Sequence, residues 1–189
     1  ISPEIKNIAL ANLRQNALLE IKESNSTGRS IGIESNPMLT PLTAAQQQQL
    51  DRLNSFLKQT KPVYKEAVAL YQSFVTQKTF PTDWLRFIKL KLVQQLGIDP
   101  QQAVNTVLLG KNNQPPAAYF MAAAEQSKRI LSILDTADYG YNVYYIYARY
   151  LEAYSYLRGK NYKMYTTAKQ LLHEALLKEQ DAAFVLHAL

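Results

Sequence analysis

The chain has 189 residues, no cysteine, 47% hydrophobic and 19% charged residues, and a formal net charge of +6. This composition is typical of a globular protein, and the lack of cysteine excludes disulfides, thiolate metal sites and cysteine nucleophiles. No dense basic block carries the charge, so the surplus can steer an acidic partner or serve only solubility.

The N-terminal region predicts one helix followed by a long loop. Ser2 and Pro3 form a typical helix start, because serine caps backbone amides and proline tolerates the first helical position. We expect this helix to reach about Lys22. Residues 23–42 are rich in Ser, Asn, Gly and Pro. A loop of roughly 20 residues is long for a small domain, so we expect it to be mobile or functional.

Apolar residues recur at helical spacing through the middle of the chain. Thr43 and Gln46 have the spacing of a capping box and predict a helix start. Thr82 or Asp83 is expected to cap a later helix. Glycine and proline divide this region into five predicted helices, near residues 43–57, 63–75, 82–97, 99–110 and 117–134. No stretch alternates with period two between hairpin turns, so no sheet is predicted.

Residues 139–189 predict a tyrosine-rich helical hairpin. Ten of the thirteen tyrosines lie between Tyr139 and Tyr165. Two helices are expected at about residues 141–158 and 162–186, with Gly159 between them. The chain is therefore predicted to be all-α: a single domain over residues 1–189, built as a compact bundle of about seven to eight helices with a long N-terminal loop.

A helical projection divides the aromatic residues of 141–158 between two sides. One side carries Tyr145 and Tyr156 together with Arg149 and Glu152. Tyrosine combines a large apolar body with a hydroxyl that needs a partner, which suits a boundary between helices or between chains. The broader side carries Tyr144, Tyr147, Tyr150, Leu151 and Tyr154.

Three interpretations of these tyrosines stay open: packing between helices, a surface for a protein or peptide, and a nucleic-acid surface. Tyr and Arg are enriched at interface hot spots. Bases stack on aromatic rings beside basic residues, although the acidic residues of this region dilute its positive charge. The candidate partner-binding residues are Tyr144, Tyr147, Tyr150, Tyr154, Arg149 and Arg158.

The sequence contains no recognisable catalytic or cofactor-binding pattern. Its six glycines form neither a phosphate-binding nor a dinucleotide-binding loop. His173 and His187 are too far apart along one continuous helix to share a metal ion. Asp135 and Asp138 could pair for acid/base chemistry, although their spacing is common near helix ends. We therefore predict no cofactor and no metal site.

The expected function is that of a non-enzymatic interaction or scaffold module, which binds a protein partner or self-associates through its tyrosine-rich surface. Two alternatives follow from the same residues. One is a nucleic-acid-associated helical protein of the packaging or coat type. The other is an enzyme whose carboxylate site is assembled from distant helices.

The sequence leaves the compartment open. No apolar run approaches the roughly 20 residues of a membrane-spanning helix, and no export signal is recognised at the N-terminus. The chain begins with Ile1. We expect a soluble protein, either cytoplasmic, or periplasmic or secreted after removal of an N-terminal segment.

Overall fold

The computed structural model describes residues 39–59, 63–110, 115–179, 182 and 185. None of these residues lies in a strand, which confirms the predicted all-α helical bundle. The predicted helix over residues 1–22 and most of the predicted loop over 23–42 lie outside the described residues. In chain order, the helices are α2 (Ala44–Leu57), α3 (Tyr64–Gln77), α4 (Thr82–Leu96), α5 (Ile98–Leu108), α6 (Ala117–Leu131), α7 (Tyr141–Arg158), the 3₁₀ helix η1 (Tyr162–Met164) and α8 (Tyr165–Lys178).

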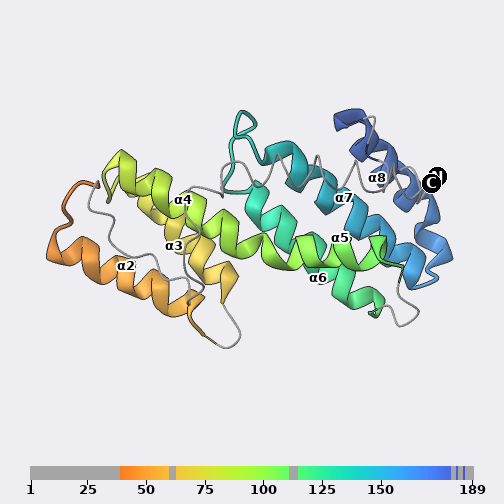
Figure 1. Cartoon of the computed structure of the whole chain (residues 1–189), viewed down its shortest axis with the longest axis horizontal. Coiled ribbons are helices and arrows are strands. Elements are labelled where there is room, and N and C mark those ends of the chain that lie inside the picture. Colours follow the sequence, from red (N-terminus) through yellow and green to blue (C-terminus); the bar gives the residue numbers. More distant parts are fainter. Residues whose placement is uncertain (1–38, 60–62, 111–114, 180–181, 183–184, 186–189) are drawn as a thin grey trace.

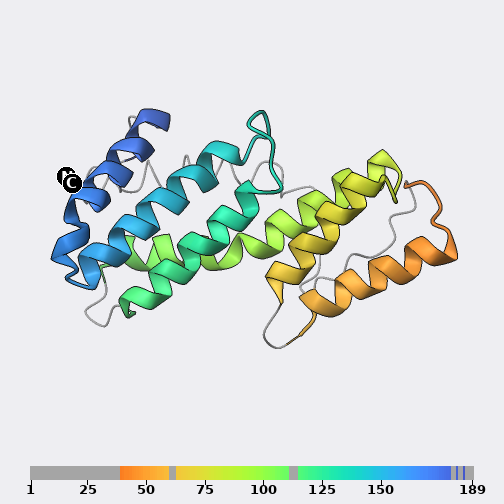
Figure 2. The same ribbon diagram turned by 180° about the vertical axis from the view of Figure 1, so that it is seen from behind.

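The helices pack around two adjacent hydrophobic cores (Figure 1). Helices α2, α3 and α4 surround the first, and α5 to α8 surround the second. Figure 2 shows from behind that α4 and α5 run nearly in line from one group to the other. The α2–α4 core consists of Leu50, Leu53, Leu57, Ala67, Val68, Tyr71, Phe74, Phe80, Trp84, Ile88, Leu92, Leu96, Ile130 and Ile133. The α5–α8 core consists of Ala103, Val104, Phe120, Ala123, Ala124, Ile146, Tyr147, Tyr150, Leu151, Ala153, Ala168, Leu171, Leu172, Ala175, Ala182 and Val185.

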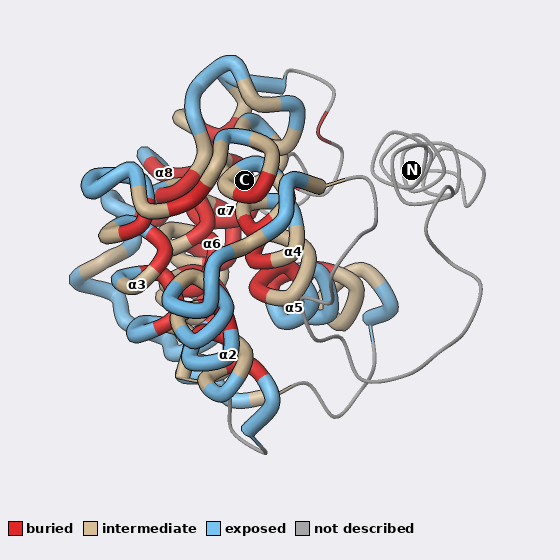
Figure 3. Tube along the Cα trace, turned by 90° about the vertical axis from the view of Figure 1, so that its left-hand side faces the viewer, coloured by how far each residue is buried: buried red, intermediate tan, exposed pale blue. Residues whose placement is uncertain are grey.

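Helix α6 contributes to both cores. Phe120 and Ala124 lie in the α5–α8 core, whereas Ile130, further along the same helix, lies in the α2–α4 core. All three side chains are completely buried. Tyr144 of α7 also packs against both cores. Figure 3 shows the buried stretches of the helices turned toward one another and the exposed stretches turned outward. The two cores are therefore joined by shared side chains.

Helix α2 begins with the capping box that the sequence predicts. The Thr43 hydroxyl accepts a hydrogen bond from the Gln46 backbone N–H at 3.3 Å, and the Gln46 side-chain oxygen accepts one from the Thr43 N–H at 2.8 Å. This reciprocal pair satisfies two amides that have no partner within the helix. The Gln46 side-chain nitrogen also donates to the Thr79 carbonyl at 2.7 Å. The cap thereby fixes α2 against the connection between α3 and α4.

Helix α4 is not capped as predicted. Its N-cap residue is Pro81, which has no capping side chain, although the Asp83 carboxylate accepts a hydrogen bond from the Trp84 backbone N–H in the first turn at 2.9 Å. Asp83 also binds Thr40, whose backbone N–H and hydroxyl donate to the carboxylate at 2.8 and 2.9 Å. The Trp84 indole N–H donates to the Thr40 carbonyl at 2.6 Å. The cap prediction at Thr82 or Asp83 is wrong because the helix already begins at Thr82, which makes Pro81 the N-cap residue.

Helices α4 and α5 meet at Gly97 without leaving the right-handed helical conformation. Gly97 has φ −74° and ψ −13°, its N–H donates to the Val93 carbonyl at 2.9 Å, and its carbonyl accepts from the Gln101 N–H at 3.2 Å. Pro100 has no N–H, so the helical hydrogen-bond ladder loses one bond just beyond the junction. The predicted break at Gly97 is thus a junction between two helices, α4 and α5, that run nearly in line and together form the α4–α5 rod.

Helix α8 begins later and ends earlier than predicted. Helix α8 begins at Tyr165 and ends at Lys178, whereas the sequence predicts a helix from 162 to 186. Residues Tyr162–Met164 form a 3₁₀ turn, and Glu179 is extended, with φ −145° and ψ 98°. Within the described ranges, every helix is too short or too polar to cross a lipid bilayer.

Candidate functional site

One side of helix α7 is buried between its neighbours α6 and α8, with which it makes extensive contacts. Tyr147 and Tyr150 are only 8% and 2% exposed, and Tyr144 and Tyr154 are half-buried. The Tyr144 and Tyr147 rings meet edge to face at 6.1 Å between centroids, and Tyr154 meets Phe120 of α6 in the same way at 4.8 Å. The sequence makes these tyrosines candidates for partner binding. In the structure they pack between helices.

Burial also determines the ionisation of these phenols. Loss of hydration raises the pKa of Tyr144 and of Tyr147 to about 12, and for Tyr147 the neighbouring Tyr144 adds to the effect. The pKa of Tyr150 is raised for the same reason. All three phenols therefore stay neutral to a higher pH than an exposed tyrosine does, as expected for core residues.

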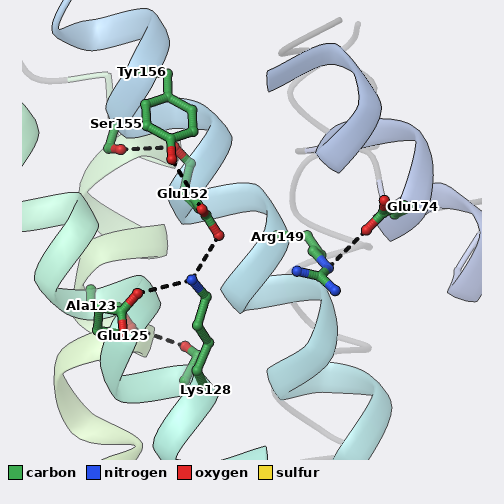
Figure 4. A network of polar contacts seen from close by, with 9 residues as sticks. Ala123, Glu125, Lys128, Arg149, Glu152, Ser155, Tyr156 and Glu174 are labelled. Atoms are coloured by element: carbon green, nitrogen blue, oxygen red, sulfur yellow. Dashed lines mark hydrogen bonds and ion pairs between the residues drawn. The ribbon is translucent and has the colours of Figure 1, made fainter. Parts of the chain in front are cut away.

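The opposite side of α7 carries an ordered arrangement of charges and a ring. The Arg149 guanidinium lies over the Tyr145 ring at 5.0 Å, and the Lys178 ammonium of α8 lies at 5.5 Å from the same ring. Arg149 Nε is 3.0 Å from a carboxylate oxygen of Glu174, also on α8 (Figure 4). This cluster fastens α8 to α7 and leaves Arg149 with a neighbouring carboxylate.

A second polar network joins α7 to α6 (Figure 4). The Lys128 ammonium of α6 lies 2.9 Å from Glu125 and 3.0 Å from Glu152 of α7. The Tyr156 hydroxyl donates to the other oxygen of Glu152 at 3.1 Å. Burial alone would lower the pKa of Lys128, but the hydrogen bonds and charges of the two carboxylates outweigh it and raise that pKa. Three charged side chains and one phenol are thus joined in contacts within α6 and between α6 and α7.

The turn between α7 and α8 is an exposed part of the hairpin. Tyr162 is 73% exposed and Tyr165 40% exposed, and their ring centroids lie 5.1 Å apart. Lys160 holds the turn with a positive φ of 50°, a conformation uncommon for a residue other than glycine. We define the hairpin tip by its exposed residues Arg158, Lys160, Tyr162, Lys163, Tyr165 and Lys169.

The hairpin tip is positively charged over a long stretch of sequence. No aspartate or glutamate occurs between Glu152 and Glu174. Among the described residues, Lys160, Lys163 and Lys169 form no ion pair with a carboxylate. The tip therefore combines basic groups with two exposed aromatic rings.

The six candidate residues predicted from the sequence lie in different environments in the structure. Tyr144, Tyr147 and Tyr150 pack in the interior, and Tyr154 packs against Phe120. Arg149 lies in the α7–α8 cluster with Glu174, and Arg158 alone belongs to the exposed tip. Tyr162 and Tyr165 are not among the candidates predicted from the sequence. The lack of acidic residues around them was the signal that could have indicated them.

The predicted carboxylate pair has a structural role. Asp138 accepts hydrogen bonds from the Lys89 ammonium of α4 at 2.8 Å and from the Asp135 backbone N–H at 2.7 Å. These contacts lower the pKa of Asp138, with the Lys89 hydrogen bond as the largest cause. A carboxylate held ionised in this way is a poor general acid at neutral pH.

No metal centre is formed by the residues that the structure describes. No group of three or more His, Asp or Glu side chains comes together there in a way that could hold a metal ion. His173 is exposed on α8, and His187 lies outside the described residues.

Comparisons of this chain with protein-family models, with curated proteins and with solved structures find no match.

Proposed function

We propose that this protein is a non-enzymatic interaction module that binds an acidic protein segment at the hairpin tip. The observation that carries this proposal is the exposure of two touching tyrosines, Tyr162 and Tyr165, among basic residues and without a neighbouring acid in the sequence. Tyrosine and basic side chains together can bind a partner that presents both carboxylates and apolar groups.

The positive charge of the hairpin tip indicates what type of partner it can bind. Lys160, Lys163 and Lys169 attract carboxylates and repel a second copy of the same tip, so tip-to-tip self-association is disfavoured. The rings of Tyr162 and Tyr165 give the partner a rigid apolar surface to cover. An acidic segment with one or two apolar side chains satisfies both requirements.

A nucleic acid is the competing polyanion, and the charges along the rest of the hairpin disfavour it. Arg149 has Glu174 beside it, and Lys128 lies between Glu125 and Glu152. Among the described residues of the hairpin, the basic surface therefore does not continue from the tip along α7 as a stripe. Nucleic-acid surfaces usually follow the backbone over a longer basic track.

The test measures fluorescence anisotropy with two labelled probes, a peptide rich in glutamate and leucine and a single-stranded oligonucleotide, at low and at physiological salt. We expect the full-length protein to bind the peptide. The triple variant Lys160→Gln, Lys163→Gln, Lys169→Gln should weaken that binding at least about tenfold, because several charge contacts are lost. The double variant Tyr162→Ser, Tyr165→Ser should weaken it as well.

A matched control variant changes the same number of charges elsewhere. Arg52, Lys58 and Lys65 are exposed on and beside α2 and α3, and their replacement by Gln should leave peptide binding unchanged. Equal loss in both triple variants would mean that only net charge matters, and the proposal would fail. Tighter binding of the oligonucleotide, with a steep fall in affinity as salt increases, would favour the nucleic-acid alternative.

A further inference from the structure

Helix α8 lies at the edge of the helical bundle, with α7 between it and α6 (Figure 1 and Figure 2). Its buried residues pack in the α5–α8 core. The opposite side, which we call the outer side of α8, follows a spacing of four, three and four residues. Its residues, all exposed, are Thr166, Gln170, His173 and Leu177. The outer side begins at the hairpin tip and ends in the last turn of the helix.

Leu177 is the unusual residue of the outer side. At 82% it is the most exposed large apolar side chain that the structure describes. It follows Tyr165 at a distance of about 18 Å along the helix, at 1.5 Å per residue. The touching rings of Tyr162 and Tyr165 thus provide an apolar group at one end of the outer side, and Leu177 provides one at the other. A partner that covers both ends needs a length of about three turns of helix.

Charge is distributed unevenly along α8. Lys163 and Lys169 lie toward the hairpin tip and form no ion pair with a described carboxylate. Glu174 lies toward the other end, where one of its oxygens is 3.0 Å from Arg149 Nε and the other accepts a hydrogen bond from the Gln170 amide at 3.0 Å. A complementary partner therefore carries its carboxylates over the tip and an uncharged apolar side chain over the far end.

The backbone of α8 indicates the conformation of this partner. The N–H and C=O groups inside an α-helix bond to one another, so α8 offers no backbone partners along its outer side. An extended peptide laid along it would lose water from amides that find no new hydrogen bond. A helix satisfies its own backbone and presents side chains every three to four residues, which matches the spacing of the outer side.

We propose that the acidic partner of the hairpin tip is an amphipathic helix of about three to four turns, which lies along the outer side of α8. Its acidic half lies over Lys163 and Lys169, with one apolar side chain against Tyr165. A second apolar side chain, about eleven residues along on the same face of the partner, covers Leu177. This inference rests on the proposed function, because it specifies the conformation and extent of the partner bound at the tip.

The experiment compares two labelled peptides by fluorescence anisotropy with the full-length protein. Both are alanine-based, have the same composition, carry their glutamates in the same half, and are matched in helicity by circular dichroism. The two leucines lie eleven residues apart on one face in the first peptide, and nine residues apart on opposite faces in the second. We expect the first peptide to bind at least about tenfold more tightly, because only it can cover Leu177 while its glutamates face the lysines.

Variants test each end of the contact. Leu177→Ser should remove the advantage of the first peptide without lowering the melting temperature, because this side chain is largely exposed. Leu109→Ser is the matched control, since Leu109 is 68% exposed at the end of α5, and this variant should retain the full difference between the peptides. The double variant Lys163→Gln, Lys169→Gln should weaken both peptides by a similar factor, because both carry the same glutamates.

The outcomes separate this inference from the proposed function. Equal affinities for the two peptides, both reduced by Lys163→Gln with Lys169→Gln, would retain an acidic partner at the tip and overturn the helix along α8. An advantage of the first peptide that persists in Leu177→Ser would also overturn it. If neither peptide binds the unchanged protein, both the proposed function and this inference fail.

Discussion

Tyr144 illustrates how one side chain can be shared between the two cores. It lies on the first turn of α7, packs against both the α2–α4 and the α5–α8 cores, and is half-buried. Its hydroxyl lies against Gly97, at the junction of α4 and α5, where a Cβ atom would collide with it. Glycine is required at this position for space and not for backbone freedom, since Gly97 has ordinary helical angles.

The replacement Gly97→Ala should therefore destabilise the protein by about 1 to 3 kcal/mol, the usual cost of overpacking. The new methyl group would meet the Tyr144 hydroxyl and approach the Val93 carbonyl to 2.9 Å. Urea unfolding of the single variant measures the cost. In the double variant with Tyr144→Phe, part of the loss should be recovered because the colliding oxygen is gone. If the losses in unfolding free energy of the two single variants simply add in the double variant, Tyr144 does not fill the space above Gly97.

At the scale of elements, the described ion pairs mostly tie one element to another. Lys89 of α4 binds Asp138 in the connection between α6 and α7, and Asp135 lies 3.6 Å from the same ammonium group. These aspartates also contribute to a pKa of about 12 for Tyr71 of α3, although burial is the larger cause. The connection between α6 and α7 is thereby held against the helices of the α2–α4 core.

The replacement Lys89→Met should lower stability by about 1 kcal/mol at pH 7, because Asp138 loses the main hydrogen bond that stabilises its charged form. The pKa of Asp138 is below its ordinary value of 3.8 in the folded protein. Its contribution is therefore complete above about pH 5 and is lost as the pH falls through the folded pKa.

Denaturation midpoints of the two proteins between pH 7 and pH 2.5 test this pH dependence. The difference between them should shrink below about pH 4. Lys65→Met, at an exposed position of α3, is the matched control and should have little effect. A difference that persists unchanged at pH 2.5 would mean that Lys89 stabilises the fold through its apolar stem alone.

For the whole molecule, the main question is whether the two cores unfold together. Ile130 and Ile133 near the end of α6 lie in the α2–α4 core, while the rest of that helix packs in the other core. The α4–α5 rod spans both groups (Figure 1). Separation of the cores would expose these shared side chains to water, so a single cooperative transition is expected.

Leu53→Ala tests this cooperativity. Leu53 is completely buried in the α2–α4 core, and its truncation should cost about 2 to 5 kcal/mol. Trp84, the single tryptophan, reports on this core by fluorescence, and amide exchange at Leu151 reports on the other. Both probes should shift to the same lower denaturant midpoint. A shift of the Trp84 signal alone would show two independently folding units.

Local sequence determined most of the helical structure. The apolar spacing of three and four residues predicts α2 to α7 close to their observed positions, and Thr43 with Gln46 forms the predicted cap. Helix formation and capping depend on residues within about one turn of each other, so a single sequence carries this information. The end of α8 is predicted too far along the chain because the apolar pattern continues beyond Lys178, where the helix ends.

Only the tertiary structure decided which surfaces are available for function. Periodicity places Tyr147 and Tyr150 on one side of α7, but whether that side meets water depends on α6 and α8. The same holds for Leu177 of α8, which is exposed although Leu171 and Leu172 of the same helix are buried. Burial depends on contacts between distant segments, and neither spacing nor composition encodes those contacts locally. The sequence therefore determined the helices, and their packing decided which side chains a ligand or partner can reach.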